Sequence, residues 1–237
     1  MDFAIYSLAL ASLGWTVLAT DTSLVINKVL SPNVNRHAGS LPGKIHIREL
    51  DWTVSADQWN WTHPTSITTP LPPHGTKQAP EAALDRTTRN DTNDNTHLQQ
   101  AGSPVNKTSP PFDLIIMSDT LYVPELLTPL LDTIYALCTA NSNPKGSSLD
   151  PTSQGTSSDH SPSSLPPPTV YVGLERRDPA FMESAISLAR DKYGFVTTRI
   201  SGRRLAVAVG KAGVKWEDIW DDVEVWKWVL KPKGETQ

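Results

Sequence analysis

The stretch from Phe112 to Tyr122, FDLIIMSDTLY, decides the predicted fold class of this chain. Its first part, Phe112–Met117, is a short and largely apolar run of the kind that fills the middle of a parallel sheet. Pro124 follows at a place where the first turn of a helix tolerates proline, and leucines and isoleucines then recur at helical spacing up to Leu137. A buried strand that leads through a short turn into an amphipathic helix indicates an α/β unit.

The same alternation of strand and helix patterns recurs on both sides of this unit. Strands are predicted at residues 16–20, 45–50, 169–174, 195–200 and 223–230, and helices at residues 4–13, 23–33 and 178–193. No long helix is expected between the last two strands, which favours an antiparallel pair at one edge. The predicted fold class is therefore α/β, with a Rossmann-like sheet that is mostly parallel and carries an antiparallel edge pair.

Composition divides the 237 residues into ordered and polar parts. Residues 63–111 and 141–168 are rich in proline, serine, threonine and asparagine, and are predicted to be disordered insertions in a single domain spanning 1–237. The formal net charge of −4 argues against a nucleic-acid partner. A single cysteine, Cys138, excludes a disulfide framework and a cysteine-based zinc cluster, and no metal site is predicted.

The N-terminal run from Phe3 to Ala19 carries no charge, but it does not read as a membrane segment. It lies at the short limit for a spanning helix, and Gly14 and Thr16 interrupt it. Its only early charge is Asp2, whereas a signal peptide begins with positive charge. We therefore expect no membrane partner, a monomer, and an intracellular location that is cytoplasmic or nuclear.

Polar and aromatic residues follow the predicted parallel strands, where ligands of such sheets bind. Asp21 follows the strand 16–20, where it could accept hydrogen bonds from ribose hydroxyls or cap the next helix. Asp51 and Trp52 follow the next strand, where the indole could cover an adenine and the carboxylate could meet its amino group. Alternatively, Trp52 packs at a domain rim. Because carboxyl ends of parallel strands meet at one edge, these residues are expected to share one pocket.

Asp119 and Tyr122 form a third candidate, in the turn after the strand that ends near Met117. An acid and a phenol three residues apart can reach the same pocket and give an anionic acceptor beside an aromatic wall. That combination suits an ammonium substrate. In the structural alternatives, Asp119 caps the following helix and Tyr122 packs.

These motifs, in this order, resemble a known enzyme family. They are LGWTVLATD at 13–21, ELDW at 49–52, FDLI at 112–115 and DTLY at 119–122. The succession is similar to the seven-β-strand protein lysine methyltransferases of the family-16 group, over the ordered parts of the chain and neither insertion. The resemblance implies S-adenosylmethionine as cofactor and a lysine of a protein as substrate.

Carried over by position, the resemblance assigns roles to individual residues. Asp21 would bind the cofactor ribose, Trp52 would lie beside the adenine, and Ser118 would line the cofactor. Asp119 and Tyr122 fall on the catalytic, substrate-side motif. The run Glu175–Arg177 matches a polar turn that often faces the substrate, or it is a solvated charge cluster.

One part of the family pattern lacks a counterpart. The family places a glycine-rich turn between its first strand and first helix, where backbone N–H groups approach the methionine moiety of the cofactor. This chain is expected to begin inside that helix, so the first strand, central in the family order 3-2-1-4-5-7-6, is missing. Two half-sheets with unpaired edges are then expected.

Two other functions remain open on the sequence. A catalytically inactive or truncated methyltransferase-like scaffold could bind protein partners. A nicotinamide-dependent oxidoreductase would explain Asp21, but not Asp119 together with Tyr122, and it needs the same glycine turn.

Overall fold

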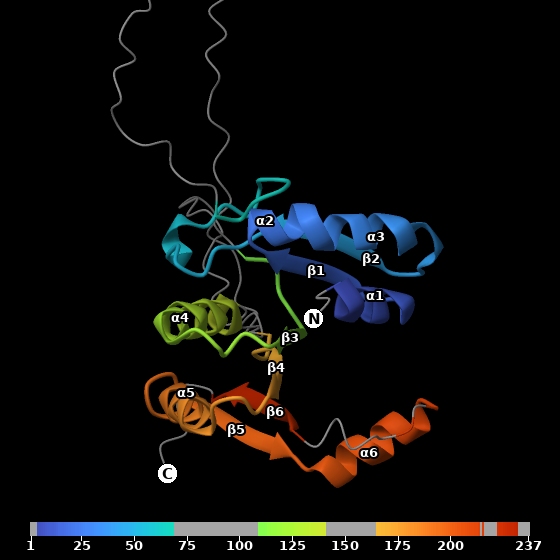
Figure 1. Cartoon of the computed structure of the whole chain (residues 1–237). Helices are drawn as coiled ribbons and strands as arrows, with labels where there is room; N and C mark the ends of the chain where they lie inside the picture. Colours follow the sequence, from blue (N-terminus) through green and yellow to red (C-terminus); the bar gives the residue numbers. More distant parts are fainter. Residues whose placement is uncertain (1–3, 69–108, 141–164, 214, 216–221, 232–237) are drawn as a thin grey trace, which may run out of the picture.

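The computed structural model describes residues 4–68, 109–140, 165–213, 215 and 222–231 (Figure 1). The greater part of the two predicted insertions, residues 69–108 and 141–164, lies outside these ranges. The described elements, in chain order, are α1 (Ala4–Ser12), β1 (Thr16–Asp21), α2 (Ser23–Val25), the π-helical turn η1 (Ile26–Leu30), α3 (Ser31–His37), the short 3₁₀ turn η2 (Ala38–Ser40), β2 (Lys44–Glu49), the 3₁₀ turn η3 (Ala56–Gln58), β3 (Leu114–Ser118), α4 (Pro124–Ala140), β4 (Thr169–Glu175), α5 (Pro179–Asp191), β5 (Phe195–Ile200), α6 (Gly202–Lys211) and β6 (Val223–Leu230).

The strands form two separate sheets. β1 and β2 pair in parallel, with Asp21 opposite Glu49 at their carboxyl ends. The second sheet has the order β3-β4-β6-β5, in which β3 and β4 are parallel and β6 is antiparallel to both of its neighbours. The chain is therefore a mixed α/β protein with open sheets, compatible with a Rossmann-like fold. The predicted division into two half-sheets is confirmed for the described residues.

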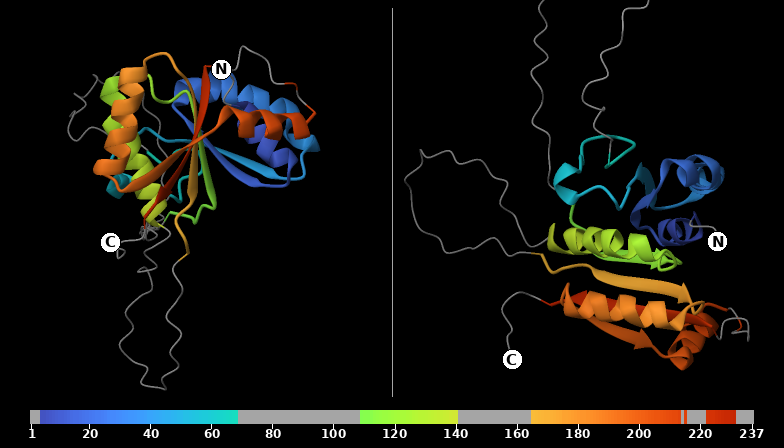
Figure 2. Two further views of the ribbon diagram at one scale, coloured as in Figure 1. Left: turned by 90° about the horizontal axis from the view of Figure 1, so that it is seen from below. Right: turned by 60° about the vertical axis from the view of Figure 1, so that its left-hand side comes forward.

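The larger core lies between the four-stranded sheet and helices α4 and α5, which run side by side on one face of it (Figure 2). β4 alternates buried and half-buried side chains, as its sequence TVYVGLE predicts, and β6 contributes the fully buried Trp228. Asp178 begins α5 because its carboxylate accepts a hydrogen bond from the Phe181 N–H at 3.0 Å. Gly194, with a φ of +75°, turns the chain after α5 into β5.

One predicted helix boundary is wrong, and one helix was not predicted. The helical segment that starts at Ser23 passes Pro32 and continues to His37, with the π-helical turn Ile26–Leu30 directly before the proline. Between β5 and β6 the structure has α6, where no long helix was expected. None of the described residues of α6 is buried, so this helix adds nothing to the core. The antiparallel pairing of β5 with β6 is confirmed.

The first insertion was predicted to start too early, because residues 63–68 belong to the folded body. The Ile67 N–H donates to the Glu49 carbonyl at 2.8 Å, and the Glu49 N–H donates to the Thr65 carbonyl at 2.9 Å. Ile67 is completely buried. At the other insertion, Pro168 is also buried beside the start of β4. The proline-rich composition of both stretches hid these short anchored ends.

An aromatic cluster joins the two sheets. Its buried members are Leu50, Trp59, Trp61 and Ile67. The residues packed around it come from β1, from the turn after β2, from the segment before β3 and from α4, and they are Leu18, Trp52, Val54, Phe112, Ala136 and Leu137. The ring centroids of Trp61 and Phe112 are 6.1 Å apart. Side-chain packing of this kind therefore holds the first half of the chain against the second.

None of the described helices is both long enough and apolar enough to cross a membrane. Within the uncharged N-terminal run, α1 ends at Ser12 and β1 begins at Thr16.

The anchored segment 63–68 can be tested with two isoleucines. Ile67→Ala is expected to lower the free energy of unfolding by about 2–5 kcal/mol, because it leaves a cavity in the cluster between the sheets. The matched control is Ile5→Ala on α1, where the side chain is 59% exposed, and it is expected to change stability by no more than about 0.5 kcal/mol. Urea denaturation measures both, and equal effects would contradict the assignment of Ile67 to the core.

Candidate functional site

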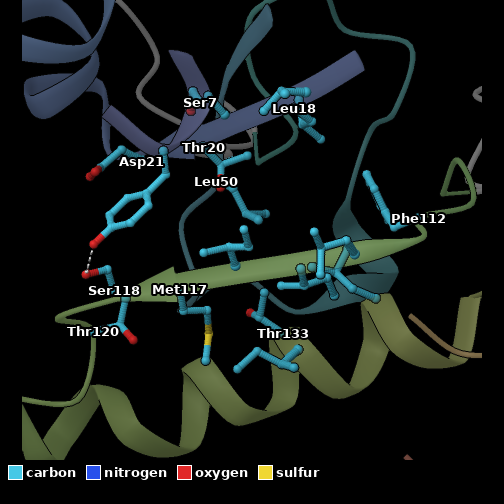
Figure 3. A pocket seen from close by; sticks show the side chains of 18 of the residues that line it. Ser7, Leu18, Thr20, Asp21, Leu50, Phe112, Met117, Ser118, Thr120 and Thr133 are labelled. Carbon is cyan, nitrogen blue, oxygen red and sulfur yellow. Dashed lines mark hydrogen bonds between the residues drawn. The ribbon is translucent and has the colours of Figure 1, made fainter. Parts of the chain in front are cut away.

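A pocket of about 350 Å³ lies between the two sheets (Figure 3). β1 forms one wall and β3 forms the opposite wall, while α1 and α4 contribute further lining residues, among them Tyr6 and Thr133. The two strands run in the same direction, because Asp21 and Ser118 lie at one end of the pocket and Leu18 and Phe112 lie toward the other. The carboxyl ends of β1 and β3 therefore give the pocket one polar end.

Asp21 lies at this polar end, half-exposed, and forms no ion pair with any of the described residues. Its carboxylate accepts a hydrogen bond of 2.7 Å from the Thr22 N–H. Burial raises the pKa of Asp21, and the hydrogen bonds from Thr22 oppose that rise only in part. Thr22, not Asp21, occupies the N-cap position of α2. The alternative in which Asp21 caps the helix is therefore wrong, and the residue lines the pocket.

Ser118 and Thr120 supply hydroxyl groups at the same end. The Ser118 hydroxyl is 3.2 Å from the Tyr6 hydroxyl, a hydrogen bond that joins α1 to β3 across the pocket. The Thr120 Oγ1 atom is buried and has no hydrogen-bond partner among the described residues. A buried hydroxyl without a partner is uncommon in proteins and indicates a place for a polar ligand atom or a water molecule. Sequence reasoning missed Tyr6, which belongs to no recognised motif, and it gave no role to Thr120, although this residue lies within the motif DTLY at 119–122.

Trp52 is among the residues that line the pocket, whereas Asp51 is not. Trp52 lines the pocket and also packs against the aromatic cluster and the larger core, so both of its predicted roles are compatible with its position. Asp51 is not among the residues that line the pocket. Its carboxylate instead accepts hydrogen bonds from the N–H and the hydroxyl of Thr53, at 2.9 and 2.7 Å. A local turn uses this side chain, so its prediction as a pocket residue is wrong.

Asp119 and Tyr122 both line the pocket, beyond the end of β3. Asp119 has a φ of 51°, in the left-handed region, and its N–H donates to the Gly173 carbonyl at 3.0 Å. Since α4 begins only at Pro124, Asp119 does not cap that helix. Tyr122 is 65% exposed, so it does not pack in the core. The structural alternatives for this pair therefore fail, and both side chains are free to meet a ligand.

The charged turn Glu175–Arg177 is mostly occupied with structural ion pairs. Arg177 pairs with Glu175 at 2.6 Å on the surface. Arg176 pairs with Glu224, a buried carboxylate that also contacts Arg199 at 3.0 Å and the Trp226 indole N–H at 2.9 Å. Burial acts to raise the pKa of Glu224, but hydrogen bonds from Arg176 and Trp226 and the nearby positive charges bring it below its ordinary value.

The set of groups at the polar end suits the adenosine part of a nucleotide-like ligand. A carboxylate can accept hydrogen bonds from vicinal hydroxyls, an indole can cover a purine, and small hydroxyls can meet ring nitrogens. The described residues that line the pocket include no glycine. The chain matches no protein-family model, and no curated protein matches it at a significant level. The function of the chain is therefore inferred from the residues of this pocket.

The backbone conformation of Asp119 leads to a test. Asp119→Asn is expected to keep the free energy of unfolding within about 0.5 kcal/mol, because asparagine tolerates the left-handed region. Asp119→Ala is expected to lose about 1 kcal/mol, since alanine lacks the short polar side chain through which aspartate and asparagine hydrogen-bond locally and tolerate the left-handed region.

Urea denaturation of both variants measures the difference. Equal stabilities of the asparagine and alanine variants would contradict the strained conformation. If the difference is found, Asp119→Asn removes the charge of this residue without disturbing the fold.

Proposed function

We propose that this chain is an S-adenosylmethionine-dependent methyltransferase that acts on a lysine side chain of a protein. The observation that carries the proposal is the convergence of Asp21, Trp52 and Ser118, from three separate segments, on one pocket. Asp119 and Tyr122 extend the same pocket on the far side of Ser118. A carboxylate, an indole and a small hydroxyl, followed by an acid and a phenol, match the order of roles in the family that the sequence resembles.

The order of the strands supports the proposal independently of the side chains. The described strands, written as β2-β1 and β3-β4-β6-β5, correspond to 3-2 and 4-5-7-6 in the family order. The direction also agrees, because β6 is antiparallel to its neighbours where the family has its single reversed strand. The place of the family's central strand corresponds to the pocket between β1 and β3.

The pocket fits the adenosine half of S-adenosylmethionine better than the methionine half. The Asp21 carboxylate would accept the ribose hydroxyls, the Trp52 indole would cover the adenine, and the Thr120 hydroxyl offers a buried polar atom that lacks a partner. With no glycine in the lining, none of the described residues is assigned to the methionine carboxylate. When bound, S-adenosylmethionine supplies an electrophilic methyl group to the lysine amine.

Asp119 and Tyr122 would receive the substrate lysine. The carboxylate attracts the ammonium group, and the phenol ring gives a cation–π surface beside it. To accept a methyl group the lysine has to lose a proton, which costs about 4.6 kcal/mol at pH 7 for an ordinary lysine with a pKa of ~10.4. Transfer of the amine from water into the pocket lowers that cost, because burial disfavours the charged form.

A methyltransferase-like scaffold without activity is the second candidate, and the lack of glycine in the pocket wall favours it. Such a scaffold would still bind adenosine through Asp21, but it would transfer no methyl group. Incubation of the chain with S-adenosylmethionine labelled in its methyl group and a mixture of cellular proteins distinguishes the two. Label that becomes protein-bound with the chain, and not with its Asp119→Asn variant, supports the enzyme.

The ribose role of Asp21 can be tested with adenosine as ligand. Saturation-transfer NMR is expected to show adenosine bound to the chain, with S-adenosylmethionine bound at most about tenfold more tightly, because the described pocket offers the methionine part few donors. Asp21→Asn is expected to weaken adenosine binding by about 10- to 100-fold, the loss that follows from removing hydrogen bonds to a charged acceptor. Asp57→Asn, an exposed acid outside the pocket, is the control that should leave binding unchanged.

The pH dependence gives a second measurement on the same variants. The ionised form of Asp21 accepts the hydroxyl hydrogen bonds, so binding is present above its pKa and is lost as the pH falls through it. Because burial raises this pKa, the loss is expected at a higher pH than for an ordinary aspartate. The Asp21→Asn variant should not show this loss. Adenosine binding that is equal in the chain and in Asp21→Asn would contradict the proposed site.

A further inference from the structure

Helix α6 has two different faces, and it lies on the other side of the sheet from α4 and α5 (Figure 2). One face consists of half-buried apolar residues, which are Leu205, Ala206 and Val209. The opposite face, which we call the basic face, consists of exposed residues, and these are Arg203, Arg204, Val207, Ala208 and Lys211. Because residues four apart lie on one side of a helix, Arg203, Val207 and Lys211 form a row about 12 Å long.

The positive charge of the basic face is not neutralised by the described acidic residues. No ion pair among the described residues includes Arg203, Arg204 or Lys211. The sequence of residues 199–215, RISGRRLAVAVGKAGVK, contains five basic residues and no acidic one. A helix face that only contacts solvent commonly carries both signs of charge, which pair along the helix. The basic face therefore has a surplus of positive charge.

Other arginines close to this helix are already paired. Arg176 and Arg199 both contact the buried carboxylate of Glu224. Arg177 pairs with Glu175 at 2.6 Å. These contacts tie the turn after β4 and the strand β5 to the start of β6. The unpaired arginines of α6 do not share this structural role.

The positions of the two arginines also give the helix no stability. Arg203 and Arg204 lie in the first turn of α6, where positive charge opposes the helix dipole. The first turn contains no acidic residue, and the N-cap residue Ser201 makes no side-chain hydrogen bond to it. The two charges therefore work against the helix that carries them, which indicates a role outside the fold.

The register of the second sheet places α6 close to the candidate site. Ser118 of β3 is opposite Gly173 of β4. Val225 of β6 is opposite both Gly173 and Ile200, the last residue of β5. This row crosses three strand spacings, which is about 14 Å. Since α6 begins directly beyond Ile200, a partner on the basic face lies along the sheet edge where the pocket has its polar end (Figure 1).

The composition of the basic face favours an acidic polypeptide over other polyanions. The face has no aromatic ring on which nucleotide bases could stack. Val207, which is 53% exposed, is its one large apolar side chain, too little for insertion into a lipid bilayer. An extended polypeptide covers 12 Å with about four residues, so carboxylates can meet both ends of the row while an apolar side chain covers Val207.

We propose that the basic face of α6 binds an acidic segment of a protein partner. Carboxylates of the segment meet Arg203 and Arg204 at one end and Lys211 at the other, with an apolar residue between them against Val207. The guanidinium group suits this role, because its fork of N–H donors matches the two oxygens of a carboxylate. The inference concerns binding alone and does not rest on the proposed methyltransferase function.

The test uses the 237-residue chain and a fluorescent synthetic peptide of sequence SEELSEES. Fluorescence anisotropy at low ionic strength is expected to show binding, with an affinity that falls as salt is added, because salt screens exposed charges. The matched control peptide is SQQLSQQS, which keeps the length and the leucine but has no carboxylate side chains. It is expected to bind at least about tenfold more weakly.

Two double variants locate the binding. Arg203→Gln together with Arg204→Gln is expected to weaken binding of the acidic peptide about tenfold. The Tm of this variant should not fall, because the two charges oppose the helix dipole. Lys28→Gln together with Arg36→Gln removes two exposed basic residues far from α6 in the sequence, and it should leave binding unchanged. Circular dichroism checks the fold of both variants.

Several results would overturn the proposal. They are no binding of the acidic peptide, equal binding of the glutamine peptide, and equal losses in the two double variants. Tighter binding of single-stranded RNA or of phosphatidylserine vesicles, lost in the α6 variant, would assign the face to another polyanion. The acids Glu217 and Asp218 follow α6 in the sequence. A gain of at least about tenfold on Glu217→Gln with Asp218→Asn would show that the chain's own acids compete for the face.

Discussion

The unpaired backbone between β1 and β3 is the constraint on which the rest of this structure depends. Because no described hydrogen-bond ladder joins the two sheets, side chains have to hold them together. The buried cluster around Trp59, Trp61 and Ile67 does so at one end, and the hydrogen bond between Tyr6 and Ser118 spans the pocket at the other. The pocket is a direct consequence of this arrangement, since the space that a strand would occupy stays open between two parallel edges.

The same constraint gives the pocket its chemistry. Parallel strands bring their carboxyl ends to one side, so Asp21 and Ser118 meet at one end although 97 positions separate them in the sequence. Trp52, from the turn after β2, also lines the pocket. Burial raises the pKa of Asp21 at this place, where the residue lines the pocket and does not cap a helix. The left-handed backbone at Asp119 and the exposed ring of Tyr122 leave both side chains beside the same opening.

The sequence predicted the strands well, because apolar runs such as that of β3 are short, continuous and bounded by polar turns. The sequence-based prediction failed where the position of a residue depends on a side-chain turn or on a contact with a segment far away in the sequence. Asp51 is drawn into a hydrogen-bonded turn with Thr53, which a strand-end position does not reveal. Ile67 lies in a proline-rich stretch and is buried only because it pairs with Glu49 of β2. Tyr6 reaches the pocket from α1 through a contact with a residue 112 positions away, which no local sequence pattern shows.

The central claim, that β1 and β3 face each other with open edges, is tested most directly by residue-resolved amide exchange of the free chain in NMR. In a strand paired on one side, alternate N–H groups point to the neighbour and to the open edge. The account predicts slow and fast exchange alternating along residues 16–21 and along residues 114–118. Uniformly slow exchange along either strand would contradict it, because both edges of that strand would then be paired in solution.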